Sequence, residues 1–470
     1  MLIFCKEYNG THDWRGKMSK RMFSGAQLRR LIAPLVVEQL LVMLVGMLDT
    51  VMVSTAGEAV ISGVSIVNDV NNLIIQMMAA LAGGGSVIVS QYLGYNDEEK
   101  TKRSASQLVM ISFVISLILG VLCVIFHADI LHLLYRSVEM DVFASAKVYF
   151  WITALSFPFL GIYNAGTALY RSMNRTKVTM WVSVLMNLIN LVGNYICVYK
   201  MGMGAAGVAI PTLISRVVAA VVMIRLCAVK DNPVCITIKE VFSFQKKIVS
   251  KILTIAVPNG VENGLFQLGK VLVSTFVATY GTMQIAANGV TNSLSSLCYV
   301  TQMAMQLAVV TVIGQCVGAG DYEQAKYYVK KMFIIGYILV VVDNLLVYLL
   351  SPYALSMYTL TEQTQKIAET ILVMDCISVS ALHMPAFVLP CCLRASGDAK
   401  YTMYIGVASM FTARVCGAYL LGTVLGYGVI GTRIAMYIDW VIRIIFFAFR
   451  YFSGKWMNFR LVGKTEKATA

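Results

Sequence analysis

The stretch QYLGYNDEEKTK at residues 91–102 is repeated as QCVGAGDYEQAK at residues 315–326, which lies 224 residues further along the chain. The same offset aligns residues 33–102 with residues 257–326 without a gap, and 18 of the 70 positions are identical. Similar hydropathy explains chance matches between apolar residues, but it does not explain proline, glycine and charged residues that coincide at one offset. The shared positions include Pro34 and Pro258, Glu38 and Glu262, Gly57 and Gly281, and Asn68 and Asn292. The sequence therefore predicts two copies of one structural unit.

The composition indicates a membrane protein. Of the 470 residues, 58% are hydrophobic and 13% are charged, and the mean hydropathy is +0.73. Soluble domains are usually about 45–50% apolar. A transmembrane helix needs about 20 apolar residues, so the chain has room for roughly a dozen spans. The apolar segments lie near residues 31–54, 60–92, 104–126, 142–168, 178–199, 206–229, 252–280, 282–316, 332–351, 366–392, 401–424 and 429–449.

The duplication and the spans together predict the architecture. Each copy contains six spans and returns to its starting side, so the two copies have the same orientation and form a parallel repeat. We expect an all-α protein with twelve transmembrane helices in two six-helix lobes, in which Pro34 and Pro258 bend their helices. The expected parts are a tail at 1–27, an N-terminal lobe at 28–229, a linker at 230–251, a C-terminal lobe at 252–450 and a tail at 451–470.

The basic residues predict the orientation. The chain has 38 Lys and Arg against 24 Asp and Glu, a net charge of +14. These residues separate apolar segments and form no aromatic-interleaved patch, so we do not expect nucleic-acid binding. With the N-terminus inside, cytoplasmic segments hold 28 of the 38 basic residues. The positive-inside rule then predicts a multi-pass protein of the cell (inner) membrane with both termini in the cytoplasm. No signal peptide is evident in the first 30 residues.

Motifs of enzymes and metal sites are missing from the sequence. The 11 cysteines lie mostly inside apolar segments, without the spacing of a disulfide framework or a CxxC metal site, and we expect them to be core residues. The chain has no HExxH, GxSxG or complete Walker loop. We therefore expect neither an enzyme nor a cofactor.

Several short stretches together resemble the multidrug and toxic compound extrusion (MATE) family of secondary antiporters, over about residues 28–450. They are Pro34 and DTVM at 49–52, SQYLG at 90–94, LYR at 169–171, LR at 393–394, Asn190 with Asn194, and GMGAAG at 202–207. The resemblance implies two six-helix lobes around a V-shaped cavity. It also implies export of organic cations driven by inward flow of Na⁺ or H⁺. Related members of the wider superfamily flip lipid-linked sugars, so a flippase is the alternative.

The first span carries two carboxylates. A charge at the bilayer centre costs about 2.5–3.5 kcal/mol, so each one needs a function or a partner. Glu38 and Asp49 are 11 residues apart, which puts them on one helix face roughly 16 Å apart. In the resemblance Asp49 matches the cation-coupling aspartate of the N-terminal lobe, and a carboxylate withdrawn from water takes up a proton more readily. We expect both residues in the ion-coupling site; the other interpretation is a carboxylate held between helices.

The fifth span has a polar face. Asn187, Asn190 and Asn194 follow the helical repeat. The family commonly has an aspartate where this chain has Asn194, so Asp49 is the main ionisable group expected there. We expect Asn190 and Asn194 to contact the ion or ligand, although asparagines also pack routinely between helices.

Spans 7 and 10 contain the expected cavity residues of the C-terminal lobe. Glu262 resembles an acidic position that related transporters use to attract cations. Lys270 lies eight residues later, about 80° around the helix, and does not face Glu262 directly. Either an acid neutralises Lys270 or the cargo is not purely cationic. His383 is a possible proton site or a core residue. Asn68 and Asn292 complete the expected cavity.

The remaining intramembrane charges suggest ion pairs. Asp343 and Asp375 are expected to have structural partners, and Asp439 is expected to pair with Arg443 at the i, i+4 spacing. The sequence thus predicts a monomeric antiporter whose partners are a small cationic or amphipathic substrate, Na⁺ or H⁺, and the lipid bilayer.

Overall fold

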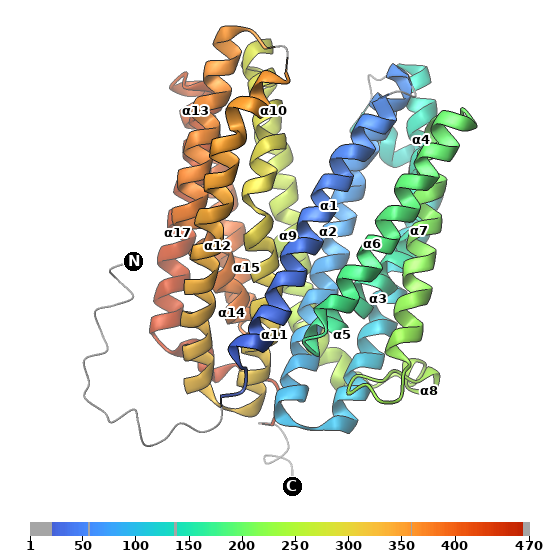
Figure 1. The fold of residues 1–470 in the computed structure, drawn as a ribbon, viewed down its shortest axis with the longest axis vertical. Helices are drawn as coiled ribbons and strands as arrows, with labels where there is room; N and C mark the ends of the chain where they lie inside the picture. Colours follow the sequence, from blue (N-terminus) through green and yellow to red (C-terminus); the bar gives the residue numbers. More distant parts are fainter. Residues whose placement is uncertain (1–20, 55–56, 136–138, 359, 464–470) are drawn as a thin grey trace.

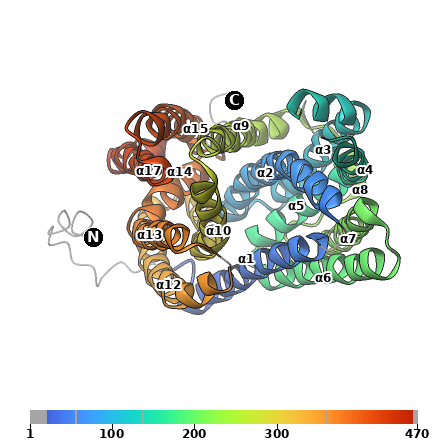
Figure 2. The same ribbon diagram turned by 90° about the horizontal axis from the view of Figure 1, so that it is seen from above.

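The computed structural model describes residues 21–54, 57–135, 139–358 and 360–463, and within these ranges the chain is helical without any strand (Figure 1). Residues 1–20 and 464–470 of the predicted tails lie outside the described residues. The first part of the chain and the second part form two groups of helices, which lie side by side in Figure 2. They converge at the end where α1 begins and α17 ends and diverge toward the other end (Figure 1).

The N-terminal lobe contains six helical segments. They are α1 (Gly25–Ser54), α2 (Glu58–Tyr95), α3 (Glu98–Leu134), α4 (Met140–Leu155) with α5 (Phe157–Ser172), α6 (Thr176–Asn194) with the π-helical η2 (Tyr195–Lys200), and α7 (Gly204–Cys227). A short helix, α8 (Ile238–Val241), lies between the lobes in the sequence.

The C-terminal lobe repeats this order. Its segments are α9 (Lys246–Val277), α10 (Thr282–Cys298) with α11 (Val300–Ala319), α12 (Tyr322–Ser356), α13 (Glu362–Ser378) with η3 (Val379–Val388) and α14 (Leu389–Ser396), α15 (Ala399–Ser409) with η4 (Met410–Val415), α16 (Cys416–Ala418) and η5 (Tyr419–Val424), and α17 (Gly428–Phe452). A 3-10 turn, η6 (Lys455–Asn458), follows. The predicted twelve-helix, two-lobe fold is confirmed.

Nine of the described helices are long and apolar enough to cross a membrane by themselves, and the bent pair α4–α5 makes ten. The other two spans are α9 and α17, which are 32 and 25 residues long and contain more polar residues. In α17 these include Arg433, Asp439 and Arg443, which are buried within the lobe. Mean hydropathy understates α17 because these charged side chains face protein, and in α9 the same holds for Asn259 and Glu262, which are buried.

Repeated residues shape equivalent parts of the two lobes. Gly57 and Gly281 precede α2 and α10 with φ of 107° and 91°, a conformation that favours glycine. Asp97 and Asp321 cap α3 and α12, where each carboxylate accepts a hydrogen bond from the backbone N–H three residues later. Local structure therefore follows the duplication as well as the order of the helices.

The lobes contact each other where α2 and α11 end. At Gly94 a Cβ atom would lie 1.9 Å from the Gln315 carbonyl oxygen, and at Gly318 it would lie 2.0 Å from the Gln91 carbonyl oxygen. Gln91 Nε2 donates to the Ala395 carbonyl at 2.9 Å, and Gln315 Nε2 donates to the Ser172 carbonyl at 2.6 Å. We call this reciprocal contact of Gln91, Gly94, Gln315 and Gly318 the interlobe clasp. The repeated stretch that defines the duplication thus begins in the contact between the lobes.

Candidate functional site

In the N-terminal lobe, Asp49 of α1 faces the polar face of α6. Asn194 Nδ2 donates to Asp49 Oδ1 over 3.0 Å. The hydrogen-bonding pattern turns the Asn190 nitrogen toward the same carboxylate, 2.9 Å from Oδ2 and 3.1 Å from Oδ1, while its oxygen accepts from Thr212 Oγ1. The two asparagines share a helix face because they are four residues apart. The structure therefore brings together Asp49, Asn190 and Asn194.

This cluster offers oxygen atoms to a small cation. Asp49 is half-buried, and within the described residues it forms no ion pair. The Asn194 oxygen is buried and has no hydrogen-bond partner in the described part of the chain. Carboxylate and amide oxygens suit hard cations, and a carboxylate also accepts a proton. The arrangement can therefore hold either of the two candidate coupling ions.

Two further residues extend the cluster. The hydroxyl of Tyr149 donates to Asn68 Oδ1 at 3.1 Å, and Tyr149 interacts electrostatically with both Asp49 and Arg216. Arg216 of α7 donates to Ser156 Oγ at 2.7 Å. Sequence reasoning missed Arg216, although a single arginine within an otherwise apolar span was a visible signal. Asn68 was expected in the central cavity and lies instead beside Tyr149 in the N-terminal lobe.

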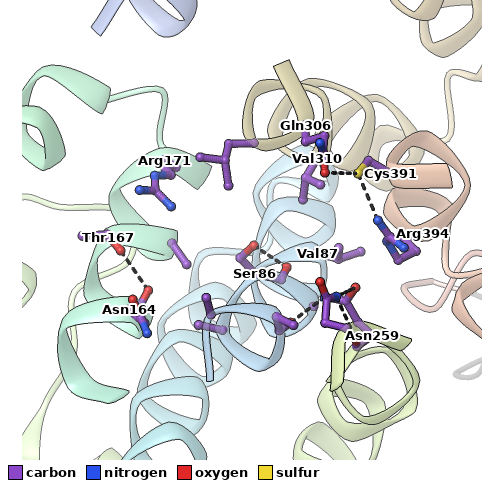
Figure 3. A pocket seen from close by; sticks show the side chains of 18 of the residues that line it. Ser86, Val87, Asn164, Thr167, Arg171, Asn259, Gln306, Val310, Cys391 and Arg394 are labelled. Atoms are coloured by element: carbon purple, nitrogen blue, oxygen red, sulfur yellow. Dashed lines mark hydrogen bonds between the residues drawn. The ribbon is translucent and has the colours of Figure 1, made fainter. Parts of the chain in front are cut away.

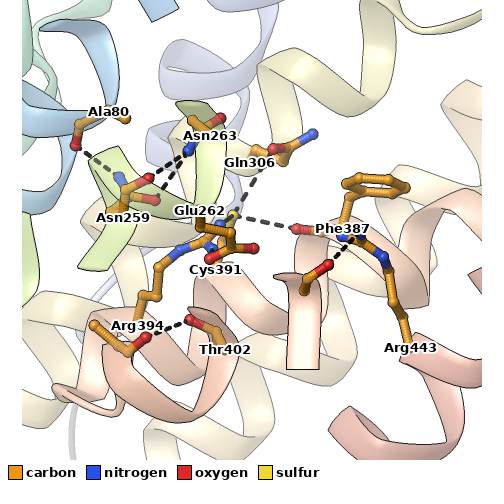
Figure 4. Close-up of polar contacts among 12 residues, drawn as sticks. Ala80, Asn259, Glu262, Asn263, Gln306, Phe387, Cys391, Arg394, Thr402 and Arg443 are labelled. Carbon is orange, nitrogen blue, oxygen red and sulfur yellow. Dashed lines mark hydrogen bonds and ion pairs between the residues drawn. The ribbon is translucent and has the colours of Figure 1, made fainter. Parts of the chain in front are cut away.

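Glu38, expected in the ion-coupling site, lies in a different contact. Arg171 Nη2 donates to Glu38 Oε1 at 2.6 Å, and Thr179 Oγ1 donates to Oε2 at 2.9 Å. The other lobe has the equivalent ion pair, in which Arg394 Nη1 donates to Glu262 Oε2 at 2.8 Å (Figure 4). Each glutamate is buried. The two glutamates thus neutralise two arginines, one in each lobe.

A cavity of about 220 Å³ lies between the lobes. Arg171 and Arg394 line it from opposite lobes, with Ser86 of α2 and Asn259 of α9 between them (Figure 3). Asn259 Nδ2 donates across the interface to the Ala80 carbonyl at 2.6 Å. None of the predicted cavity residues Glu262, Lys270, His383, Asn68 and Asn292 is among its lining residues. Arg171 and Arg394 were visible in the sequence as repeat-related residues, but not as cavity residues.

The C-terminal lobe holds a second polar region. Arg433 of α17 donates to Asn292 Oδ1 at 2.5 Å and to Asn288 Oδ1 at 3.1 Å, and it forms an ion pair with Asp375 at 3.6 Å. The expected pair of Asp439 with Arg443 is present at 2.9 Å.

His383 and Lys270 belong to the same region. His383 is buried and stacks on Phe387 with ring centroids 4.2 Å apart. Lys270 interacts electrostatically with Arg414 and Arg433, and its side chain is exposed. The helix prolines Pro34 and Pro258 lie inside α1 and α9, at equivalent places in the two lobes.

Comparisons with known proteins agree with the duplication. A family model described as MatE matches the chain twice, at residues 34–196 and 258–420. An uncharacterized transporter of Bacillus subtilis, YisQ, is 27% identical over 430 residues, which cover 90% of this chain and 93% of the relative. The probable multidrug resistance protein NorM of Thermotoga maritima is 23% identical over 450 residues, which cover 92% of each chain.

Solved structures share the fold. An outward-facing multidrug resistance MATE transporter of the MOP superfamily has a TM-score of 0.83 and 19% identity, over 92% of this chain and 96% of that one. A MOP superfamily transporter from Pyrococcus furiosus has a TM-score of 0.81 and 21% identity, with the same coverage.

Proposed function

Because the chain belongs to the MATE family of multi-pass membrane transporters, we propose that it is a secondary active antiporter. In this proposal it exports organic cations or amphipathic drugs in exchange for Na⁺ or H⁺, through alternating access between its two lobes. The flippase alternative has less support, because relatives that match most of the chain are named as probable multidrug resistance proteins.

The observation that carries the proposal is the Asp49 cluster. A carboxylate in a membrane-spanning helix needs a partner, and the hydrogen bonds to Asp49 come from the neutral amides of Asn190 and Asn194. Neutral donors leave the negative charge in place, so a cation or a proton can bind and leave. Asp49 is the coupling residue in this proposal, and Asn190 and Asn194 hold its carboxylate in position.

Coupling follows if ion and cargo favour different arrangements of the lobes. A ligand shifts such an equilibrium only by its difference in affinity for the two states. Exchange of one Na⁺ or H⁺ for a singly charged organic cation moves no net charge, so the concentration gradient of the ion drives it. When the cargo is neutral or zwitterionic, one net charge crosses the membrane, and 100 mV then supplies about 2.3 kcal/mol, roughly a 50-fold concentration ratio of cargo.

The orientation is part of the proposal. The positive-inside rule places both termini and the linker at residues 230–251 in the cytoplasm. The interlobe clasp lies where α2 and α11 end, at the same end of the molecule as the start of α1 and the end of α17 (Figure 1). The described arrangement is then closed toward the cytoplasm, and the lobes diverge toward the outside.

Ethidium efflux from proteoliposomes tests the proposal. An inward gradient of Na⁺ or protons should drive efflux by the native protein. The Asp49→Asn variant should lose at least tenfold of the gradient-dependent rate, because its neutral amide has no charge for an ion to neutralise. Asp129→Asn makes the same chemical change at an exposed position on α3 and should keep the native rate. Unchanged efflux by Asp49→Asn would remove this residue from the coupling role.

The same assay identifies the ion. Replacement of Na⁺ by K⁺ at fixed pH abolishes efflux if Na⁺ is the coupling ion, and leaves it intact if the proton is.

A further inference from the structure

The interior of the C-terminal lobe has more positive charge than its carboxylates neutralise. Three of its arginines, Arg394, Arg433 and Arg443, have ion-pair partners. Lys270 and Arg414 form no ion pair with any described residue. The carboxylate of Asp439 lies close to Arg414 but is bonded to Arg443 at 2.9 Å.

Asp343 is a further carboxylate within the membrane-spanning part of this lobe. It lies on α12, accepts a hydrogen bond from Thr301 at 3.0 Å and forms no ion pair among the described residues. The charged groups that interact electrostatically with Lys270 are Arg414 and Arg433. Among the described residues, Lys270 thus has cations as its charged neighbours.

The two lobes differ in charge at two repeat-related positions. The repeat-related position of Asp49 is Val273, and that of Lys270 is Gly46. One lobe thus has a membrane carboxylate where the other has an apolar residue, and the second lobe has a membrane lysine where the first has glycine. This charge difference cannot come from the fold, which both lobes share.

Buried polar atoms in the same region also lack partners. Arg433 is 9% exposed, and its Nε has no hydrogen-bond partner among the described residues. The Nε1–H of Trp440 also lacks a partner among these residues, as do Nδ1 of His383, which is a donor in one of its two neutral tautomers, and the carboxylate oxygen Oδ2 of Asp439. A buried donor without a partner costs about 1–3 kcal/mol. Unused N–H donors beside unpaired cations are the features of a site for an anion.

Aromatic rings adjoin these cations. His383 lies 4.2 Å from Phe387 and 5.1 Å from Trp440 between ring centroids. Arg414 and Arg443 lie over the ring of Phe266, at 5.3 and 5.2 Å from its centroid. An inorganic anion gains no stabilisation from packing against aromatic side chains, whereas the aromatic part of an organic anion does.

We propose that Lys270, Arg414 and Arg433 form a subsite in the C-terminal lobe for the anionic group of an aromatic, amphipathic cargo, such as a carboxylate, sulfonate or phosphate. This inference rests on the proposed transport function and adds a preference to it: among cationic and amphipathic cargoes, those that also carry a negative group, such as zwitterions, should bind most tightly. It gives Lys270 a role, because no acid among the described residues forms an ion pair with it.

Two matched dyes test the subsite on the purified, full-length protein. Rhodamine 110 has a free carboxylate, and rhodamine 123 is its methyl ester with the same cationic ring system. Fluorescence polarisation gives the Kd of each. The native protein should bind rhodamine 110 at least tenfold more tightly. Equal Kd values for the two dyes, or a lower Kd for the ester, would overturn the proposal. Equal Kd values are also expected if the subsite binds inorganic anions only.

Substitutions test whether the preference for rhodamine 110 over rhodamine 123 arises from Lys270. Lys270→Met should raise the Kd for rhodamine 110 about tenfold and change the Kd for rhodamine 123 by less than about a factor of two. This variant should therefore lose most of the preference for rhodamine 110 over rhodamine 123. Lys270→Arg retains the positive charge and should retain the preference. Lys366→Met removes an exposed lysine of α13 and should change neither Kd. A preference for rhodamine 110 that survives Lys270→Met would contradict the subsite. Since this assay measures binding alone, it decides the subsite even if ethidium efflux fails and the antiport proposal falls.

Discussion

The ion pair of Glu38 with Arg171 shows what a charge inside the bilayer requires. The side chain of Glu38 is 3% exposed and that of Arg171 is 17% exposed. Thr179 donates to the second carboxylate oxygen of Glu38, so both oxygens have donors. Glu262 and Arg394 repeat the pair in the other lobe. Paired in this way, both glutamates hold arginines in place at the cavity, whereas the carboxylate of Asp49 accepts from neutral amides.

Loss of one partner from the pair should destabilise the protein. Glu38→Gln leaves the Arg171 charge uncompensated, and we expect it to lower the free energy of unfolding by about 3 kcal/mol. Glu262→Gln should have a similar effect because the contact is repeated. Denaturant unfolding in detergent measures both. Glu98→Gln, which breaks an exposed pair with Lys102, should cost less than about 1 kcal/mol. Equal effects of Glu38→Gln and Glu98→Gln would mean that the buried pair does not stabilise the lobe.

Sequence reasoning reached some of these residues and not others. The contact of Asp49 with Asn190 and Asn194 could be anticipated, since helical spacing puts the asparagines on one face and the family resemblance points to Asp49. The partner of Glu38 could not, because Arg171 lies 133 residues away and spacing within one helix says nothing about contacts between helices. The unpaired state of Lys270 was likewise visible only once α9, η4 and α17 were placed together.

Two of the expected spans are not continuous straight helices. The span expected at 142–168 bends by 47° between α4 and α5, next to Pro158. The span expected at 282–316 is divided into α10 and α11 before Val300. Hydropathy predicts that a segment crosses the membrane, but it carries no information on where the backbone hydrogen-bond pattern breaks. The number and order of the spans could therefore be predicted better than their internal geometry.

Helices α2 and α11 should separate if their closest contact is enlarged. A Cβ at Gly94 or at Gly318 would lie 1.9–2.0 Å from backbone of the opposite lobe, which cannot move as a side chain can. Gly94→Ala and Gly318→Ala should each open the interlobe clasp. Pulsed EPR between spin labels at Lys102 and Lys326 should then show a longer distance as the main population. Gly83→Ala, in α2 with open space at its Cβ, should keep the native distance. No change in either clasp variant would show that this contact does not hold the lobes together.

At the scale of the molecule, the two lobes share one fold but differ in the charges of their interiors. The N-terminal lobe has the carboxylate of Asp49, and the C-terminal lobe has Lys270 and Arg414, which form no ion pair among the described residues. The duplication allowed the two lobes and their parallel arrangement to be predicted, because repeated loops at a constant offset fix the equivalence of the helices. Divergence between the copies at positions such as 49 and 273 then separates the site proposed for the ion from the subsite proposed for cargo.

The central claim is that an ion at Asp49 changes the arrangement of the lobes. The distance between spin labels at Lys102 and Lys326, recorded with and without the coupling ion, tests it most directly. In the native protein the ion should redistribute the populations of short and long distances, and in Asp49→Asn the distribution should be the same with and without the ion. An Asp49→Asn variant that responds to the ion as the native protein does would contradict the account.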